Sequence, residues 1–358
     1  MHRHKHEEEA SVKNCSEFTY SAAAILLAIC LTFLSPDGLG QTQLILVATG
    51  STMLEPLYTL WGNEYQKAHP GTQLHYLPVG TSESANRILS GVGDLGGGDA
   101  PIPEQQLKEA KHAVMEVPTV IVGIAVFYKL PGSPTSIRLT GPLLANIYLG
   151  KTTSWSDREI ARLNPDIKLP DLPIKVLHRT DGKGSNYIFS DFLSKVSPEF
   201  LTKVGTNVSP KWPVGVAFSR CQDLLANAAE TTGAIGYAEL RCGEKSGLGI
   251  AQIRNAAGRF VKASTKSISD VAVSMESKLK EDFRISLTNA PGKESYPIVS
   301  FSWFYVPVDP QDLQRSAAVK EFLNWVYGSG QEIAQAQGYT TLPASVLQRV
   351  RAKVAALH

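Results

Sequence analysis

Residues 173-PIKVLHRTDGKGSNYIFSDFLSKV-196 contain an apolar run, a loop rich in glycine and polar residues, and a second largely apolar segment, in that order. The run 173–179 predicts a strand, and the spacing of apolar residues over 184–196 predicts a helix. The loop has the composition of a nucleotide phosphate loop, but its order Gly-Lys-Gly-Ser at 182–185 lacks the Walker spacing. The stretch therefore predicts a strand–loop–helix unit whose helix N-terminus suits an anion.

The same alternation of strands and helices continues outward from this unit in both directions. We expect further strands at 44–49, 73–79, 117–128, 234–240 and 300–308, and helices at 55–69, 84–91, 141–150, 156–164, 315–327 and 344–355. Ser156 is the expected N-cap of one helix, with Glu159 completing a capping box. This order predicts an α/β fold, in which ligands favour the carboxyl ends of strands.

Length and charge narrow the class of protein. A chain of 358 residues is long for one core, so two domains are expected. A net charge of +2 gives no indication of nucleic-acid binding, because nucleic acid is usually bound by a concentrated basic face. We therefore expect no nucleic-acid partner.

The N-terminal region, 1–40, is expected to be a signal peptide region. Its segment 21-SAAAILLAICLTFL-34 is apolar, without charge, and short for a membrane span, and 35-SPDGLGQTQ-43 then interrupts it. Cleavage is expected near Gly40. The alternative is an uncleaved segment that anchors the protein in a membrane. Either reading places the remaining chain outside the cytoplasm.

Two cysteines, Cys221 and Cys242, follow the signal peptide region. An even pair in an exported protein favours a disulfide. The alternative is two free buried thiols.

Four loops share one composition and one kind of position. Each follows an expected strand and is rich in glycine or hydroxyl residues: 49-TGSTML-54, 79-VGTSES-84, 96-GGGDAP-101 and 179-RTDGKGSN-186. Three of them open a helix, where unpaired backbone N–H groups and the positive end of the dipole favour anions. One such loop alone is usually a turn with an N-cap. Together, four loops of this kind predict a dehydrated cage for an oxyanion.

The chain resembles the phosphate-binding proteins of bacterial ABC importers. The resemblance covers essentially all of 43–358, in order and with similar spacing. It is carried by 50-GSTMLEPLYTLW-61, 79-VGTSESANRI-88, 94-DLGGGDAPI-102, 118-PTVIVGIAV-126, 146-NIYLGK-151, 179-RTDGKGSNYIFSDFLSKV-196, 211-KWPVG-215, 233-GAIGYAE-239 and 323-LNWVYGSGQEIAQAQGYTTLP-343.

The resemblance implies a two-lobed, type II-like periplasmic-binding-protein fold with two mixed sheets flanked by helices. Lobe 1 would comprise 43–121 plus 299–358, and lobe 2 would comprise 122–298. Crossing segments near 118–128 and 298–303 would form the hinge. The implied function is capture of inorganic phosphate by closure of a cleft and delivery to a membrane permease. The protein would act as a periplasmic monomer, without catalysis and without a cofactor.

The resemblance also assigns the loop residues by position. Thr52 and Met53, the latter through its backbone N–H, would bind from the first loop, and Thr81 with Ser82 from the second. Asp99 would lie in the third. The fourth would supply Arg179, Lys183, Gly184 and Ser185, with Asp181 holding Arg179 in place.

The chemistry of two of these residues favours phosphate. Arg179 can donate charge-assisted, bidentate hydrogen bonds to two phosphate oxygens. A carboxylate such as Asp99 repels an anion unless it accepts a proton from that anion. Phosphate carries such a proton near neutral pH and sulfate does not, so Asp99 would discriminate between them.

Three residues depart from the family pattern. Lys183 and Gly98 each stand where the family usually has serine, and Glu83 stands where it usually has glycine. Lys183 either reaches the anion or points into solvent. Glu83 weakens binding only if its carboxylate faces the ligand. Affinity and strict selectivity for phosphate depend on these positions more than anion binding itself does.

Two rival functions remain open in the sequence. One is a binder of another tetrahedral oxyanion, such as sulfate, arsenate or molybdate. The other is a phosphate-handling enzyme, which would need a metal cluster or an activated nucleophile. Outside the N-terminal region the histidines are scattered, and only His178 adjoins the expected site, so no metal site is expected.

Overall fold

The computed structural model describes residues 43–132, 136–279, 283–308 and 312–357. The expected signal peptide region, 1–40, and its cleavage near Gly40 lie outside these residues. Within the described ranges, no helix has both the length and the apolar character needed to cross a membrane.

A β–α–β unit opens the described chain. The strands β1 (Leu44–Thr49) and β2 (Thr72–Leu77) pair in parallel, and α2 (Glu55–Ala68) connects them. Pro56 lies in the first turn of α2, where its missing N–H group leaves no hydrogen bond unmade. Leu57 and Trp61 recur at helical spacing and are buried, so one face of α2 is fixed against the core.

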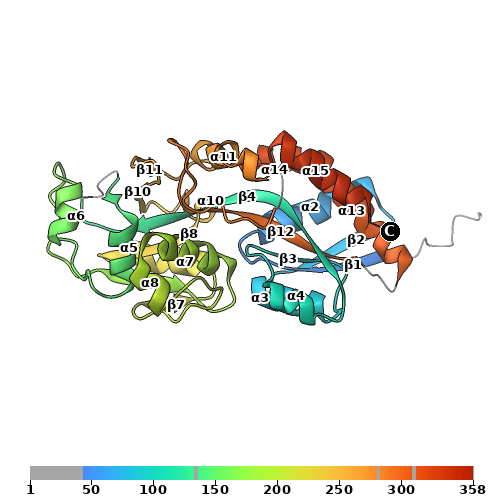
Figure 1. Cartoon of the computed structure of the whole chain (residues 1–358), viewed down its shortest axis with the longest axis horizontal. Helices are drawn as coiled ribbons and strands as arrows, with labels where there is room; N and C mark the ends of the chain where they lie inside the picture. The colour runs from blue at the N-terminus through green and yellow to red at the C-terminus, as the bar shows by residue number, and fades with distance from the viewer. Residues whose placement is uncertain (1–42, 133–135, 280–282, 309–311, 358) are drawn as a thin grey trace, which may run out of the picture. The chain divides into compact units, whose positions relative to one another are not determined.

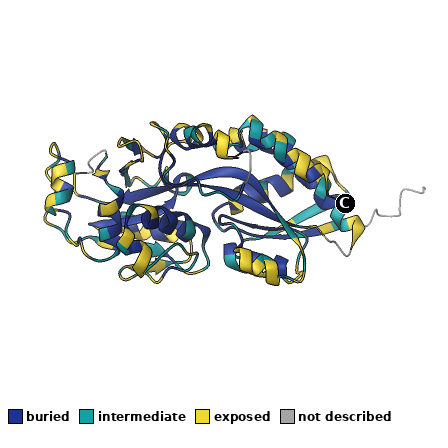
Figure 2. Ribbon diagram, in the orientation of Figure 1, coloured by how far each residue is buried: buried dark blue, intermediate teal, exposed yellow. Residues whose placement is uncertain are grey.

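The long strand β4 (Val114–Tyr128) organises the largest sheet (Figure 1). Its first part pairs antiparallel with β12 (Val299–Pro307), and its last part pairs antiparallel with β8 (Ala234–Glu239). Most of β4 and β12 is buried (Figure 2), which explains why both read as nearly continuous apolar runs.

The full order of this seven-stranded sheet is β3-β12-β4-β8-β6-β7, with β9 paired to β4. The remaining members are β3 (Gly96–Gly98), β6 (Lys175–Arg179), β7 (Val216–Phe218) and β9 (Gly249–Ile250). A three-stranded sheet joins β11 (Phe260–Lys262), β10 (Gln252–Arg254) and β5 (Arg138–Leu139).

Helices flank these sheets. They are α3 (Thr81–Leu89), α4 (Glu104–Glu109), α5 (Gly141–Tyr148), α6 (Arg158–Leu163), α7 (Gly184–Val196), α8 (Pro198–Lys203), α9 (Cys221–Glu230), α10 (Leu240–Gly243), α11 (Thr265–Ser274), α12 (Glu276–Leu279), α13 (Leu313–Trp325), α14 (Gln331–Ala336) and α15 (Ala344–Ala355). A π-helical segment, Val326–Gly330, joins α13 to α14.

The predicted α/β fold with mixed sheets flanked by helices is confirmed, but the sheets are arranged differently. We expected two sheets, and the described strands form three. The largest of the three does not keep to one predicted lobe, because β4 is 15 residues long and pairs with both β12 and β8. It thereby joins strands from both predicted lobes in one hydrogen-bonded sheet. The division into lobes remains a prediction.

The predicted N-cap of α6 was wrong by one residue. Asp157, not Ser156, precedes the helix, and its carboxylate accepts the Glu159 N–H at 2.8 Å. The Ser156 hydroxyl instead donates to Asp171 at 2.7 Å. Adjacent aspartate and serine are both good caps, and this contact decides between them.

Candidate anion-binding site

The four glycine- and hydroxyl-rich loops meet at one place in the structure. The Ser51 hydroxyl joins the first loop to the third by donating to Asp99 Oδ2 at 2.5 Å. The Asp99 N–H joins the third to the second by donating to Thr81 Oγ1 at 3.2 Å. The second contacts the fourth through the Ser82 N–H, which donates to the Gly182 carbonyl at 3.2 Å. Residues far apart in sequence thus surround one small region.

In the first loop, Ser51 has a role that our sequence analysis missed. Besides donating to Asp99, its hydroxyl accepts the N–H groups of Met53 at 3.1 Å and Leu54 at 3.3 Å. It therefore fixes the turn that leads into α2, which begins at Glu55. The Met53 N–H, which we predicted to bind the anion, is directed to Ser51 in this structure, and Thr52 is half-buried beside it.

Asp99 is the buried carboxylate of the site. Its side chain is 1% exposed, and its Oδ1 accepts the Ser302 hydroxyl at 2.8 Å. Burial raises the pKa of Asp99 to about 6, although hydrogen bonds from Ser51 and Ser302 and the charge of Arg179 oppose the rise. The carboxylate is therefore mainly ionised at neutral pH and protonates in mildly acidic solution.

Ser302 reaches Asp99 from β12, more than 200 residues along the chain, because β12 pairs with β3. The β12–β4 register shifts between Ser302, which pairs with Val120, and Trp303, which pairs with Pro118, so Thr119 is the extra residue on β4. The Thr119 hydroxyl donates to the Ser302 carbonyl at 3.1 Å, and Tyr58 Oη lies 3.0 Å from Ser302 Oγ. These contacts fix the Ser302 hydroxyl behind the carboxylate.

Arg179 ends β6 and is 2% exposed. Its Nε donates to the Phe218 carbonyl at 3.2 Å and its Nη2 to the Ser219 carbonyl at 2.6 Å. These are the guanidinium hydrogen bonds formed within the part of the chain that the structure describes, and they leave further N–H groups of the five for a ligand. Burial lowers the pKa of Arg179, and the nearby charge of Asp99 is among the opposing influences.

The positioning of Arg179 differs from our expectation. We expected Asp181 to hold Arg179 in place. Asp181 is exposed, however, and the contacts among the described residues do not join it to Arg179. Two backbone carbonyls at the end of β7 hold the guanidinium instead. They are in place because β6 and β7 pair in parallel, with Arg179 opposite Phe218.

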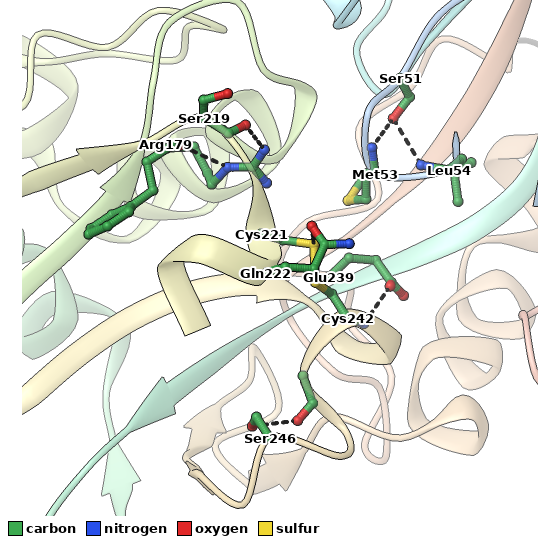
Figure 3. The surroundings of a disulfide bond; sticks show 12 residues. Ser51, Met53, Leu54, Arg179, Ser219, Cys221, Gln222, Glu239, Cys242 and Ser246 are labelled. Carbon is green, nitrogen blue, oxygen red and sulfur yellow. Dashed lines mark hydrogen bonds between the residues drawn. A yellow bond between two sulfur atoms is a disulfide. The ribbon is translucent and has the colours of Figure 1, made fainter. Parts of the chain in front are cut away.

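A disulfide follows these carbonyls along the chain. Cys221, two residues after Ser219, is bonded to Cys242 (Figure 3). This bond fixes the start of α9 to α10. The segment that orients Arg179 is therefore held at both ends, by β7 on one side and by the disulfide on the other.

The start of α7 provides donors to the same region. A Cβ on Gly184 would lie 2.4 Å from Asp99 Cβ and 2.8 Å from Thr81 Oγ1, so only glycine fits there. Ser185 is 2% exposed, and its hydroxyl has no hydrogen-bond partner within the described structure. A buried hydroxyl without a partner at a helix N-terminus is an observation that calls for a ligand.

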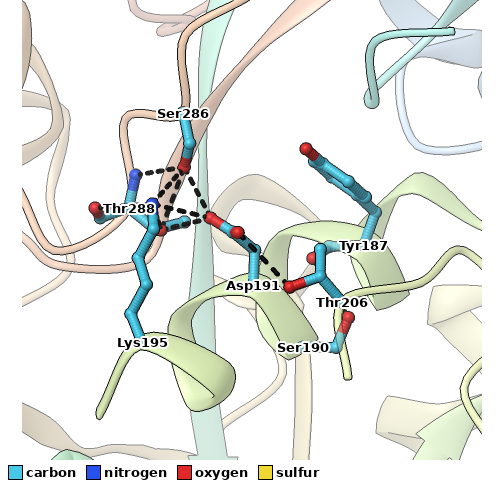
Figure 4. A network of polar contacts seen from close by, with 7 residues as sticks. All are labelled: Tyr187, Ser190, Asp191, Lys195, Thr206, Ser286 and Thr288. Carbon is cyan, nitrogen blue, oxygen red and sulfur yellow. Dashed lines mark hydrogen bonds and ion pairs between the residues drawn. The ribbon is translucent and has the colours of Figure 1, made fainter. Parts of the chain in front are cut away.

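Contacts at the other end hold α7 in place (Figure 4). The Lys195 ammonium lies 2.9 Å from Asp191 Oδ2 and donates to Thr288 Oγ1 at 2.7 Å. The Ser286 hydroxyl donates to the same Asp191 oxygen at 2.5 Å. This network ties α7 to the segment that leads into β12, and it thereby steadies the N-terminus of α7.

The three residues that depart from the family pattern, Glu83, Gly98 and Lys183, have different surroundings. Glu83 forms an i,i+4 ion pair with Arg87 at 2.7 Å, and its side chain is 50% exposed. Gly98 is closely packed, since a Cβ there would lie 2.2 Å from the Tyr305 hydroxyl oxygen. Lys183 is half-buried and precedes α7, with its side chain toward the second loop.

His178 adjoins the site, with its Nδ1 3.1 Å from the Arg179 carbonyl oxygen. His178 stacks obliquely on Trp212, and burial lowers its pKa. Among the described residues there is no group of three or more histidine, cysteine, aspartate or glutamate side chains that could hold a metal ion. The polar contacts described above place hydroxyl and backbone donors around the Asp99 carboxylate.

Comparisons with known proteins agree with this geometry. The PBP superfamily domain matches residues 35–329. A protein from Xylella fastidiosa (strain Temecula1) named phosphate-binding protein PstS is 31% identical over 320 residues, covering 89% of this chain and 87% of its own. A protein of the same name from Pasteurella multocida is 30% identical over 331 residues, covering 92% and 94%.

A solved structure shares the fold. It is described as a high affinity periplasmic phosphate-binding protein bound with phosphate at pH 8.5. The match has a TM-score of 0.65 and 18% identity, and it covers 86% of this chain and 93% of that one.

Proposed function

The chain belongs to the PBP superfamily and, within it, to the family of phosphate-binding PstS proteins, and we propose that it captures inorganic phosphate for an ABC importer. One observation carries the proposal. A buried acceptor, Asp99, lies against the start of α7, where the Ser185 hydroxyl has no partner within the described structure, and it is close enough to the Arg179 guanidinium at the end of β6 to feel its charge. A tetrahedral anion that keeps one proton satisfies both sides.

The roles follow from charge and geometry. Arg179 pairs with phosphate oxygens, and Ser185 and the first N–H groups of α7 donate to them. Thr81 and Ser82 add donors from the start of α3, and Thr52 adds a hydroxyl from the first loop. Asp99, ionised at neutral pH, accepts the proton that HPO4²⁻ still carries. Sulfate has no such proton, so it would place two acceptors against each other, which costs about 1–3 kcal/mol or more.

The two predicted lobes supply a mechanism for capture. Lobe 1, 43–121 plus 299–358, contributes Asp99 and the first two loops, and lobe 2, 122–298, contributes Arg179 and α7. The bond from Ser82 to Gly182 joins the two sets, which supports a closed arrangement. β4 and β12 cross between the lobes and would serve as the hinge, and the closed protein would present a joined surface to a membrane permease.

The setting and the chemistry complete the proposal. The protein acts as a periplasmic monomer and breaks no bond. Arsenate, which is protonated and similar in shape, is the rival ligand that this site would exclude least.

Calorimetry and thermal unfolding test the proposal. Phosphate should bind one-to-one at pH 7.5 and raise the melting temperature, since a ligand that binds only the folded state stabilises it. Neither phosphate monoesters nor nucleotides should be hydrolysed. An unchanged melting temperature at millimolar phosphate, or measurable hydrolysis, would contradict the proposal.

A further inference from the structure

Lys183 reaches across the candidate site. It precedes α7 in the fourth loop, yet a Cβ on Gly80 would lie 3.3 Å from its Nζ and 3.6 Å from its Cδ. Gly80 directly precedes Thr81, the first residue of α3. The ammonium therefore lies against the start of one helix while its backbone starts another, and both helix N-termini belong to the candidate site.

A second positive charge, that of Arg179, acts on this ammonium. Burial lowers the pKa of Lys183, and the positive charge of Arg179 lowers it further. The ion pairs formed among the described residues include neither Lys183 nor Arg179. Two cations near each other in a partly desolvated place repel, and an anion between them turns this repulsion into attraction.

Charge counting gives Lys183 a specific consequence. Ionised Asp99 offsets the charge of Arg179, so without Lys183 the site would be close to neutral. With Lys183 the site carries a net positive charge. Coulomb attraction to a net charge doubles when the ligand charge doubles, so the ammonium favours a dianion over a monoanion of the same shape.

We propose that Lys183 is a second cationic ligand of the anion site, and that Arg179 and Lys183 together make the site select doubly charged tetrahedral anions. This inference rests on the proposed function and names the ionic form of its ligand, HPO4²⁻. The Ser185 hydroxyl, two residues on and without a partner among the described residues, independently supports a ligand at this end of α7. A serine at position 183 would add a donor but no charge.

The experiment measures phosphate affinity by calorimetry from pH 6.5 to 8.5, at low and high salt. Over this range phosphate changes from largely monoanionic to dianionic, while Asp99, with a pKa of about 6, stays mainly ionised. Wild-type affinity should rise with pH and fall with salt. Lys183→Met should lose about tenfold in phosphate affinity at pH 8.5 and much less at pH 6.5. The ammonium that it lacks attracts the dianion more strongly than the monoanion.

Two further variants complete the design. Lys183→Arg keeps the charge and should keep the rise with pH. Lys168→Met, which removes an exposed lysine, should behave as wild type at every pH. A Lys183→Met protein with the wild-type affinity, pH profile and salt dependence would overturn the inference, as would a Lys183→Arg protein that has lost the rise with pH. If wild-type protein binds no phosphate at any pH, the proposed function itself fails.

Discussion

The two sides of the candidate site differ in how far the protein satisfies them. The Asp99 carboxylate accepts hydrogen bonds from the Ser51 and Ser302 hydroxyls, and the Asp99 backbone N–H donates to Thr81. At the start of α7, by contrast, the Ser185 hydroxyl has no partner within the described structure. The acceptor is thus held by the protein's own donors, whereas the Ser185 donor is left unsatisfied within the described residues.

This difference teaches how one site can combine affinity with selectivity. In the proposed site, the positively charged donors would attract any oxyanion and would supply most of the affinity. A fixed acceptor then tests whether that anion carries a proton. Changes on the donor side should therefore reduce affinity for all oxyanions, and changes on the acceptor side should mainly alter the preference among them.

The largest effect is expected for Arg179→Ala. The substitution removes charge-assisted hydrogen bonds worth about 1.5–3 kcal/mol each, so phosphate affinity should fall about 100-fold or more. Calorimetry at pH 7.5 measures the loss, and an unchanged circular dichroism spectrum verifies the fold. Arg162→Ala is the matched control, since Arg162 is an exposed arginine on α6. Near-normal affinity in Arg179→Ala would refute the donor side as described.

A smaller but still large effect is expected for Gly184→Ala. The new methyl group would meet Asp99 and Thr81, so the two sides of the site could not approach as they do in this structure. Phosphate affinity should fall about tenfold or more, by loss of the close contact between loops rather than of any ligand group. Equal affinities for wild type and Gly184→Ala, measured by calorimetry, would show that this approach is unnecessary for binding.

The smallest effect on affinity is expected for Ser302→Ala. It removes one donor to Asp99 Oδ1, a hydrogen bond that lowers the pKa of the carboxyl, so that pKa should rise further above its ordinary value. Phosphate affinity at pH 8 should change only a few-fold. The pH at which sulfate begins to bind should move upward. Ser302→Thr, which keeps the hydroxyl, should retain the wild-type pH dependence, and identical pH profiles for Ser302→Ala and wild type would refute the role of Ser302.

The sequence predicted one class of site residue and not another. Loops that follow a strand and open a helix carry a local signal, so the segments around Thr81, Asp99 and Ser185 could be found. Ser302 lies within a buried strand and is brought to Asp99 only by the pairing of β12 with β3. No local pattern marks such a residue.

The groups that position Arg179 were missed for a different reason. They are the backbone carbonyls of Phe218 and Ser219, and every residue has a carbonyl. Only the parallel pairing of β6 with β7 decides which carbonyls face the guanidinium. Asp181 was the expected partner of Arg179 because it is a carboxylate two residues away in the sequence, but it is exposed in the turn before α7. The fold class was predictable from alternation alone, whereas the joining of sheets depended on how far β4 extends.

The central claim is that Asp99 selects phosphate by accepting its proton. The most direct test measures the affinities for phosphate and sulfate between pH 5 and pH 8. Burial raises the pKa of Asp99 to about 6, so above pH 7 the carboxylate is ionised and should exclude sulfate. Below pH 6 the protonated carboxyl can donate to sulfate, and the ratio of phosphate to sulfate affinity should fall about tenfold or more. A ratio that stays constant across this range, or equal affinities at pH 8, would contradict the account.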